Sequence, residues 1–168
     1  MSGGGSGSFV RAGSDELATP RDLAAWLSRN ALLPAGLELS AADLDRARAA
    51  RGGLRAQLAA HGGGSLDQSA LRRLDEAAVG ARAQVRFDRD CTSRLELISR
   101  DFDDALGTLL GLVHAASCEG KWQALKLCDH PQCGRAYFDF TKNLSGRWCT
   151  RRCGDKIRAK AHRRRRKG

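Results

Sequence analysis

Apolar side chains recur every three or four positions in three successive stretches of the N-terminal half, which is the period of an amphipathic helix. The first stretch opens at residues 19–22, where a threonine that can cap is followed by a proline and an early acid. Leu23, Trp26 and Leu27 then form one apolar face. The sequence therefore predicts a helix that begins at Pro20 and is ended by residues 33–36.

The next two stretches predict two further helices. Ser40 repeats the capping pattern and opens a longer helix, whose middle we expect residues 52–53, both glycine, to soften. The glycine-rich segment 61–64 breaks it, and a third helix is expected from about 66 to 79. The residues expected to face inward on that third helix are Leu71, Leu74 and Ala78. Three helices joined by short polar turns predict a small bundle.

Strict alternation then replaces the helical period at residues 83–88 and 93–99, which predicts a β-hairpin. The apolar side chains expected on one side of the hairpin are Val85, Phe87, Leu95 and Leu97. A helix is expected from 101 to about 118, with acidic residues in its first turn.

The C-terminal part predicts short strands at 125–128, 137–140 and 147–149, then a helix from about Arg151. The expected fold class is α+β and mostly helical: an N-terminal helical domain with a β-hairpin, then a treble-clef-like zinc finger that ends in a basic helix. The expected division is a flexible leader at 1–8, a helical domain at 9–120 and the finger at 121–168.

Four cysteines of this C-terminal part form two close pairs. Cys128 and Cys133 are followed after fifteen residues by Cys149 and Cys153. Two such pairs suit one tetrahedral Zn²⁺ held by four thiolates. Complete ligation leaves no open coordination position, so the ion would be structural and would supply folding energy to a segment too small for its own core.

Other interpretations of the cysteines are weaker. Disulfides are disfavoured because no secretory signal precedes the cysteines, and the cytoplasm is the expected compartment. His130 is an alternative fourth ligand. Cys91 and Cys118 fall outside the paired pattern and are expected to be buried or half-buried thiols.

Charge separates the two parts of the chain. The net charge is +10, yet residues 1–120 carry 14 Lys and Arg against 16 Asp and Glu, whereas residues 121–168 carry 15 against 3. A positive excess confined to one end favours a nucleic-acid partner over a merely solvated surface.

The helix after Cys149 concentrates this charge and predicts phosphate contacts along one face. The predicted nucleic-acid-binding residues are Arg151, Arg152, Lys156, Arg158, Lys160, Arg163, Arg164, Arg165, Arg166 and Lys167. Phe138, Phe140 and Trp148 could stack on unpaired bases, but a small core over the zinc site is the favoured interpretation.

The cysteine spacing, followed by Arg158-Ala-Lys-Ala-His162 and a run of arginines, resembles the CGNR zinc-finger proteins of bacteria, especially actinobacteria. Residues 16–27 and the helices after them look like the ABATE domain of those proteins. The motif that names the family, Cys-Gly-Asn-Arg, stands here as Cys153-Gly154-Asp155-Lys156, with a charged acid in place of a neutral amide.

The resemblance implies a stress-linked transcription regulator that binds duplex DNA in the nucleoid, with the four paired cysteines as zinc ligands. It leaves the role of the N-terminal domain open: a small-molecule or protein effector, or a homodimer. The alternative is an RNA- or ribosome-associated zinc protein. An enzyme is disfavoured because the N-terminal domain has no nucleophile–base pair, phosphate loop or His/carboxylate cluster, and no apolar stretch is long enough to span a membrane.

Overall fold

The computed structural model describes residues 17–96 and 98–165. Helix α1, Pro20–Arg29, and helix α2, Ala41–His61, both begin with a capping box. At α1 the backbone N–H of Asp22 donates to Thr19 Oγ1 at 3.2 Å, and the N–H of Thr19 donates back to the Asp22 carboxylate at 2.9 Å. Each box satisfies N–H groups that a helix start leaves unpaired, so both predicted starts are confirmed.

Helix α3, Gln68–Ala78, packs along α2, and its approach depends on a glycine. A Cβ on Gly53 would lie 2.5 Å from Leu74 Cβ and 2.8 Å from the Ala70 carbonyl oxygen. Helix α2 is continuous through both glycines, and Gly53 admits its neighbour. That the glycines soften the helix stays a prediction. The inward face of α3 is Ala70, Leu74 and Ala77 rather than the predicted set, of which only Leu74 is fully buried.

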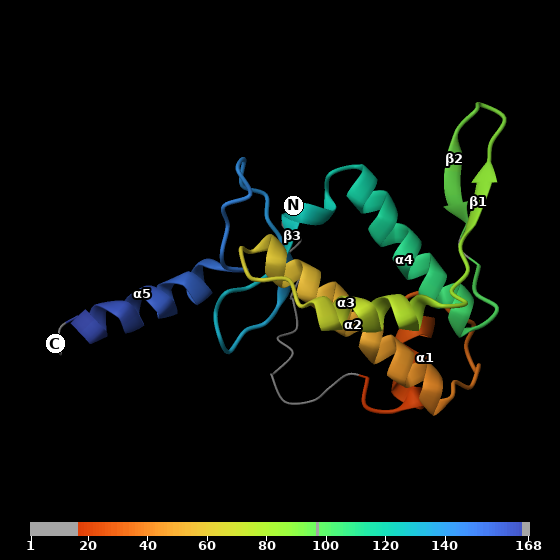
Figure 1. Ribbon diagram of the computed structural model, residues 1–168, viewed down its shortest axis with the longest axis horizontal. Coiled ribbons are helices and arrows are strands. Elements are labelled where there is room, and N and C mark those ends of the chain that lie inside the picture. Colours follow the sequence, from red (N-terminus) through yellow and green to blue (C-terminus); the bar gives the residue numbers. More distant parts are fainter. Residues whose placement is uncertain (1–16, 97, 166–168) are drawn as a thin grey trace, which may run out of the picture.

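The predicted hairpin is present as β1, Gln84–Phe87, and β2, Ser93–Glu96, paired antiparallel. Figure 1 shows it projecting from the helices. The Leu95 side chain packs directly against Gly111, where an added Cβ would lie 2.6 Å from Leu95 Cδ2. Val85 and Phe87, in contrast, are 50% and 80% exposed. Val85 and Phe87 therefore do not form the apolar inner face that their alternation predicted, and Leu97 lies outside the described residues.

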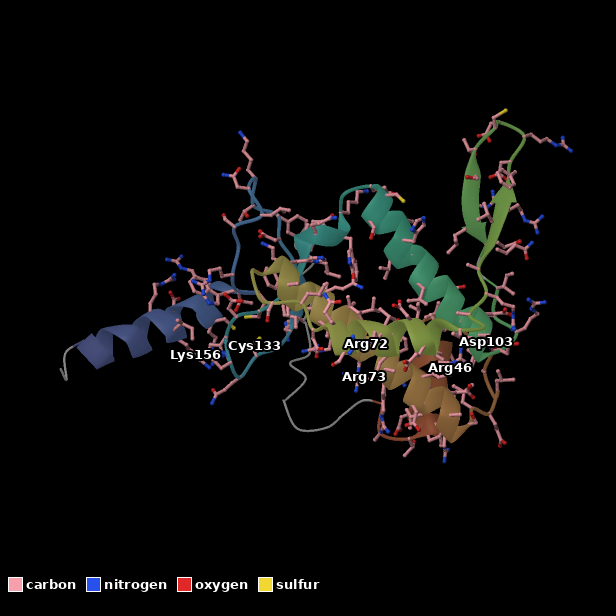
Figure 2. All side chains as sticks on the ribbon, in the orientation of Figure 1. Arg46, Arg72, Arg73, Asp103, Cys133 and Lys156 are labelled. Atoms are coloured by element: carbon pink, nitrogen blue, oxygen red, sulfur yellow. The ribbon has the colours of Figure 1, made fainter. Side chains whose placement is uncertain are left out.

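Helix α4, Phe102–Cys118, starts at the predicted position and carries a fully buried acid in its first turn. Asp104 accepts hydrogen bonds from Arg82 Nε and Arg100 Nε, each at 2.8 Å. The Arg100 contact is the main reason that the pKa of Asp104 falls to about 2, against the opposing effect of burial. Next to it, Asp103 pairs with Arg46 of α2 at 2.8 Å, at the end of the helical part far from Cys133 (Figure 2).

The core of the helical part lies between α1, α2, α4 and the loops around them. Its buried apolar residues are Leu17, Leu23, Leu27, Leu32, Leu33, Leu44, Ala50, Leu74, Phe102, Ala105 and Leu106.

The remaining residues form a small α+β unit at one end of α2. A 3₁₀ turn, η1, Trp122–Ala124, leads into β3, Leu125–Leu127, which pairs antiparallel with β4, Ala136–Phe138; helix α5, Arg151–Arg165, follows. The third predicted strand is absent, since residues 147–149 are irregular. They contact the first cysteine loop through the Asp129 N–H, which donates to the Arg147 carbonyl at 2.9 Å, and through Arg147 Nε, which donates to Asp129 Oδ2 at 2.8 Å. The predicted class, α+β and mostly helical, is confirmed.

The two parts of the chain meet along α2. Trp122 Nε1 donates to Gln57 Oε1 at 2.8 Å, and His61 Nδ1 lies 2.9 Å from the Leu125 carbonyl oxygen. The His61 and Trp122 rings meet edge to face. Helix α2 therefore contributes to the helical core and also supports β3.

Candidate metal centre and nucleic-acid surface

The four paired cysteines converge on one point, although the chain separates them by up to 25 positions. Their sulfur atoms all lie within 4.8 Å of one another, with Cys133 and Cys149 at 3.5 Å and Cys149 and Cys153 at 3.8 Å. A tetrahedral ion with Zn–S bonds of about 2.3 Å separates its sulfur ligands by about 3.8 Å. The four thiols are free and their spacing fits one zinc ion.

Two local structures position these sulfurs. The first pair is held by a tight turn, in which Cys133 N–H donates to the His130 carbonyl at 2.8 Å and Cys128 N–H donates to the Arg135 carbonyl at 2.9 Å. Gly134 has a φ of 55°, which closes this turn and which a residue with a Cβ adopts only with strain. The second pair brackets the start of α5, where Cys153 N–H donates to the Thr150 carbonyl at 3.1 Å.

Burial raises the pKa of two of the four thiols. It raises the pKa of Cys149 to about 12 and raises that of Cys128 above its ordinary value. At Cys133 burial acts in the same direction, but a hydrogen bond from the Arg135 backbone and contacts with the other thiols outweigh it and lower the pKa. A metal ion bound by thiolates must therefore displace protons, and its affinity falls as the pH falls.

His130, the alternative ligand, does not join the group of four sulfurs. Its Nδ1 accepts the backbone N–H of Gln132 at 3.2 Å, and its side chain is nearly buried. In this arrangement the histidine supports the turn that carries Cys133.

A buried ion pair between β3 and the segment after β4 was missed by the sequence analysis. Lys126 of β3 and Asp139 are 4% and 3% exposed, and Lys126 Nζ lies 2.9 Å from Asp139 Oδ2. Lys126 also donates to the carbonyl oxygens of Leu144 and Gly146, while the other Asp139 oxygen accepts from Thr141. The Lys126 contact is the main cause that holds the pKa of Asp139 well below its usual range. One signal was available: a lysine alternating with Leu125 and Leu127 in a short strand points to the opposite face from them.

The aromatic residues of this unit do not form the small core that was favoured. Phe138 and Phe140 are 40% and 88% exposed, and their ring centroids lie 4.7 Å apart. Trp148 is half-buried instead, with the guanidinium groups of Arg147 and Arg158 over its ring at 5.6 and 5.4 Å. The exposed phenylalanine pair is available to stack on a ligand.

The first turns of α5 present the predicted basic residues to solvent, and Figure 1 shows this helix extending away from the remainder of the chain. Arg151, Arg152, Lys156 and Arg158 are all exposed, and Lys156 follows Cys153 by three positions on α5. Arg158 pairs with Asp155 at 2.6 Å, so the acid that replaces the family's amide makes an ion pair within the helix. The side chains of the other predicted contacts lie outside the described residues: Lys160, Arg163, Arg164, Arg165, Arg166 and Lys167.

The two unpaired cysteines are exposed, and the expectation that they are buried was wrong. Cys91 lies in the hairpin turn with a φ of 63°, and Cys118 ends α4 with its sulfur 3.6 Å from His114 Nε2. Neither joins the group of four sulfurs.

Two known families match successive parts of the chain. Residues 5–117 match the family model ABATE, described as "putative stress-induced transcription regulator", and residues 124–166 match the CGNR zinc finger. No curated protein matches the chain. Among the helices in the described ranges, none has the length and apolar character needed to cross a lipid bilayer. The matched families are of regulator and zinc-finger types rather than enzymes.

Proposed function

Because the chain belongs to the ABATE family and carries a CGNR zinc finger, we propose that it is a zinc-dependent transcription regulator that binds duplex DNA. Cys128, Cys133, Cys149 and Cys153 hold one structural Zn²⁺, and the basic face of α5 contacts the phosphate backbone. The helical part responds to stress through an effector or by forming a homodimer, and the protein acts on the nucleoid in the cytoplasm.

The observation that carries this proposal is the position of the basic face. Cys153 lies in the first turn of α5, so the metal site fixes the helix that exposes Arg151, Arg152 and Lys156. The sequence adds a further run of arginines along the same helix. Guanidinium and ammonium groups arranged along one helix neutralise phosphates and release counterions, which supplies affinity for nucleic acid of any sequence.

The test is the dependence of duplex affinity on salt, measured by fluorescence anisotropy with a 20-base-pair DNA. We expect a steep loss of affinity with added salt, and a triple variant R151Q/R152Q/K156Q should reduce the slope by about 3 if each residue meets one phosphate. The control is R72Q/R73Q, which removes exposed charge from α3 and should leave the slope unchanged (Figure 2). A flat salt response of the unaltered chain would contradict the proposal.

A second candidate, binding of RNA or single-stranded nucleic acid, is favoured by the exposed Phe138–Phe140 pair. Such rings stack on unpaired bases regardless of sequence, and each stacked base contributes about 1–3 kcal/mol. Competition between the DNA duplex and a single-stranded RNA of equal length separates the two candidates. If RNA is the ligand, RNA competes better than duplex and F140A weakens its binding, whereas F140A leaves duplex affinity nearly unchanged.

A further inference from the structure

The helical part contains an apolar cavity of about 320 Å³ between α1, α2 and α4. Leu27, Ala50 and Leu106 of the core form its inner wall, and Trp26, Leu110 and Val113 lie nearer the surface. Protein interiors rarely keep voids larger than a water molecule, and apolar cavities stay dry and accept small apolar molecules. The volume is that of a small-molecule site.

Two arginines give this cavity a charged edge. Among the described residues that line it, Arg51 and Arg55 are the only ionisable ones, and they lie one helical turn apart on α2. An apolar chamber with guanidinium groups at one side matches an amphipathic ligand that has a hydrocarbon body and an anionic head.

One of these arginines also contacts the metal-binding turn. Arg55 Nη2 donates to the Gly134 carbonyl oxygen at 2.8 Å, and Gly134 follows Cys133 directly. Further along the same helix, Gln57 and His61 contact Trp122 and Leu125. A group that draws the Arg55 side chain toward the cavity must therefore compete with the bond that ties α2 to the turn.

We propose that this cavity is the effector site of the protein, that it binds a small apolar acid, and that the acid's anionic head takes Arg55 from the Gly134 carbonyl. Binding then loosens the first cysteine turn from α2, without any change in covalent structure. The regulatory consequence rests on the proposed DNA-binding function, whereas the site and its contact with Gly134 do not.

The binding test uses the full zinc-loaded chain and decanoate as the probe, with titration calorimetry as the measurement. We expect one saturable site, with 1-decanol, which has the same chain length and a neutral head, binding about tenfold or more weakly. R55Q should weaken decanoate by a similar factor, and A47L should abolish binding by filling the cavity. R72Q, which removes an exposed arginine from α3, is the matched control and should bind normally.

If A47L does not fold, L110F fills the same cavity from its outer wall. Four results would overturn the site: no saturable binding, equal affinity for decanoate and decanol, full affinity in R55Q, or binding that appears only after residues 1–16 are deleted. The last result would mean that this segment of the chain occupies the cavity.

The loosening of the first cysteine turn is tested by amide hydrogen exchange of residues 128–135, a measurement that needs no DNA. Decanoate should accelerate exchange in the unaltered chain, and R55Q should exchange rapidly with or without decanoate. Unchanged exchange in a chain that binds decanoate would contradict the proposal that the ligand loosens this turn. A chain that binds decanoate but no duplex would overturn the proposed function and leave the site standing.

Discussion

The helical part and the cysteine module, residues 122–159, are stabilised in different ways. Leucines such as Leu23, Leu27 and Leu106 are almost fully buried in the helical part, and capping side chains satisfy the helix starts. The buried side chains of the module are mostly polar or sulfur-bearing: Cys128, Lys126, His130 and Asp139, with Trp122 and Ala124 where it meets α2. The first part is stabilised by apolar burial, which the second largely lacks, so the stability of the second part must come mainly from metal ligation. Its buried Lys126–Asp139 pair has to stay complete, because either charge alone would be left uncompensated.

This difference predicts that the two parts respond to different perturbations. Loss of metal should unfold the module and leave the helices folded. Changes in the helical core or its ion pairs should destabilise the helices and leave the module folded.

The largest effect is expected from C149S. Structural zinc in small finger modules contributes on the order of 10 kcal/mol of folding free energy, and three thiolates hold the ion poorly. We expect loss of bound zinc, unfolding of the module and loss of duplex binding. The far-ultraviolet circular dichroism of α1 to α4 should persist, and zinc content and dichroism measured together check this result.

C118S is the matched control for C149S, since Cys118 is exposed and lies outside the group of four sulfurs. It should retain zinc and fold normally. If C149S also melted the helical signal, the helices would depend on the module and the comparison would fail.

The second effect is expected from K126M. The variant leaves the Asp139 carboxylate buried without its cation, which costs about 3–5 kcal/mol in comparable pairs. We expect the module to unfold at lower denaturant concentration while still zinc-loaded, as followed by the fluorescence of Trp122 and Trp148 in a W26F background. The double variant K126M/D139L, which removes both charges, should recover much of this loss, and a double variant as unstable as K126M would contradict the role of the pair.

The third effect belongs to the helical part and is expected from D104N. Replacing the carboxylate weakens its bonds to Arg82 and Arg100 and should cost about 2 kcal/mol. The pKa of Asp104 in the folded state is lowered to about 2. The contribution of its carboxylate to the free energy of unfolding is therefore fully present above the ordinary carboxyl pKa and is lost as the pH falls through about 2.

Thermal melts of D104N therefore should lie below those of the unaltered chain at neutral pH and should converge with them in strong acid. D75N, at an exposed position of α3, should follow the unaltered chain throughout. A constant difference between D104N and the unaltered chain across the acid range would refute the assignment.

Much of the fold follows from local sequence, because its cause lies within a few residues. Thr19 and Ser40 cap the helices that they were expected to cap, and the paired cysteines converge as their spacing indicates. The caps depend on interactions between residues close together in the sequence, and the convergence of the cysteines depends on a metal whose ligand geometry is fixed.

Features that depend on which elements meet in space could not be predicted in this way. The packing role of Gly53 depends on α3, which lies alongside it. The exposure of Phe87 and Phe140 depends on whether another part of the chain covers these side chains. The partnership of Lys126 with Asp139 needs the β3–β4 pairing. Alternation identifies the faces of a strand but not what covers them.

The smallest effect is expected at the junction between the two parts, from Q57A. This variant removes the acceptor of the Trp122 indole N–H, whose ring is 9% exposed, and an unsatisfied buried donor costs about 1 kcal/mol or more. Because the bond joins α2 to the module, the cost should lower the stability of both parts slightly. W122F removes the donor, so the cycle of Q57A, W122F and the double variant isolates the bond, with a coupling energy of about 1 kcal/mol in denaturant melts. Zero coupling would mean that this bond does not join the two parts, and the contacts of Arg55 with Gly134 and of His61 with Leu125 would then be the ones that link α2 to the module.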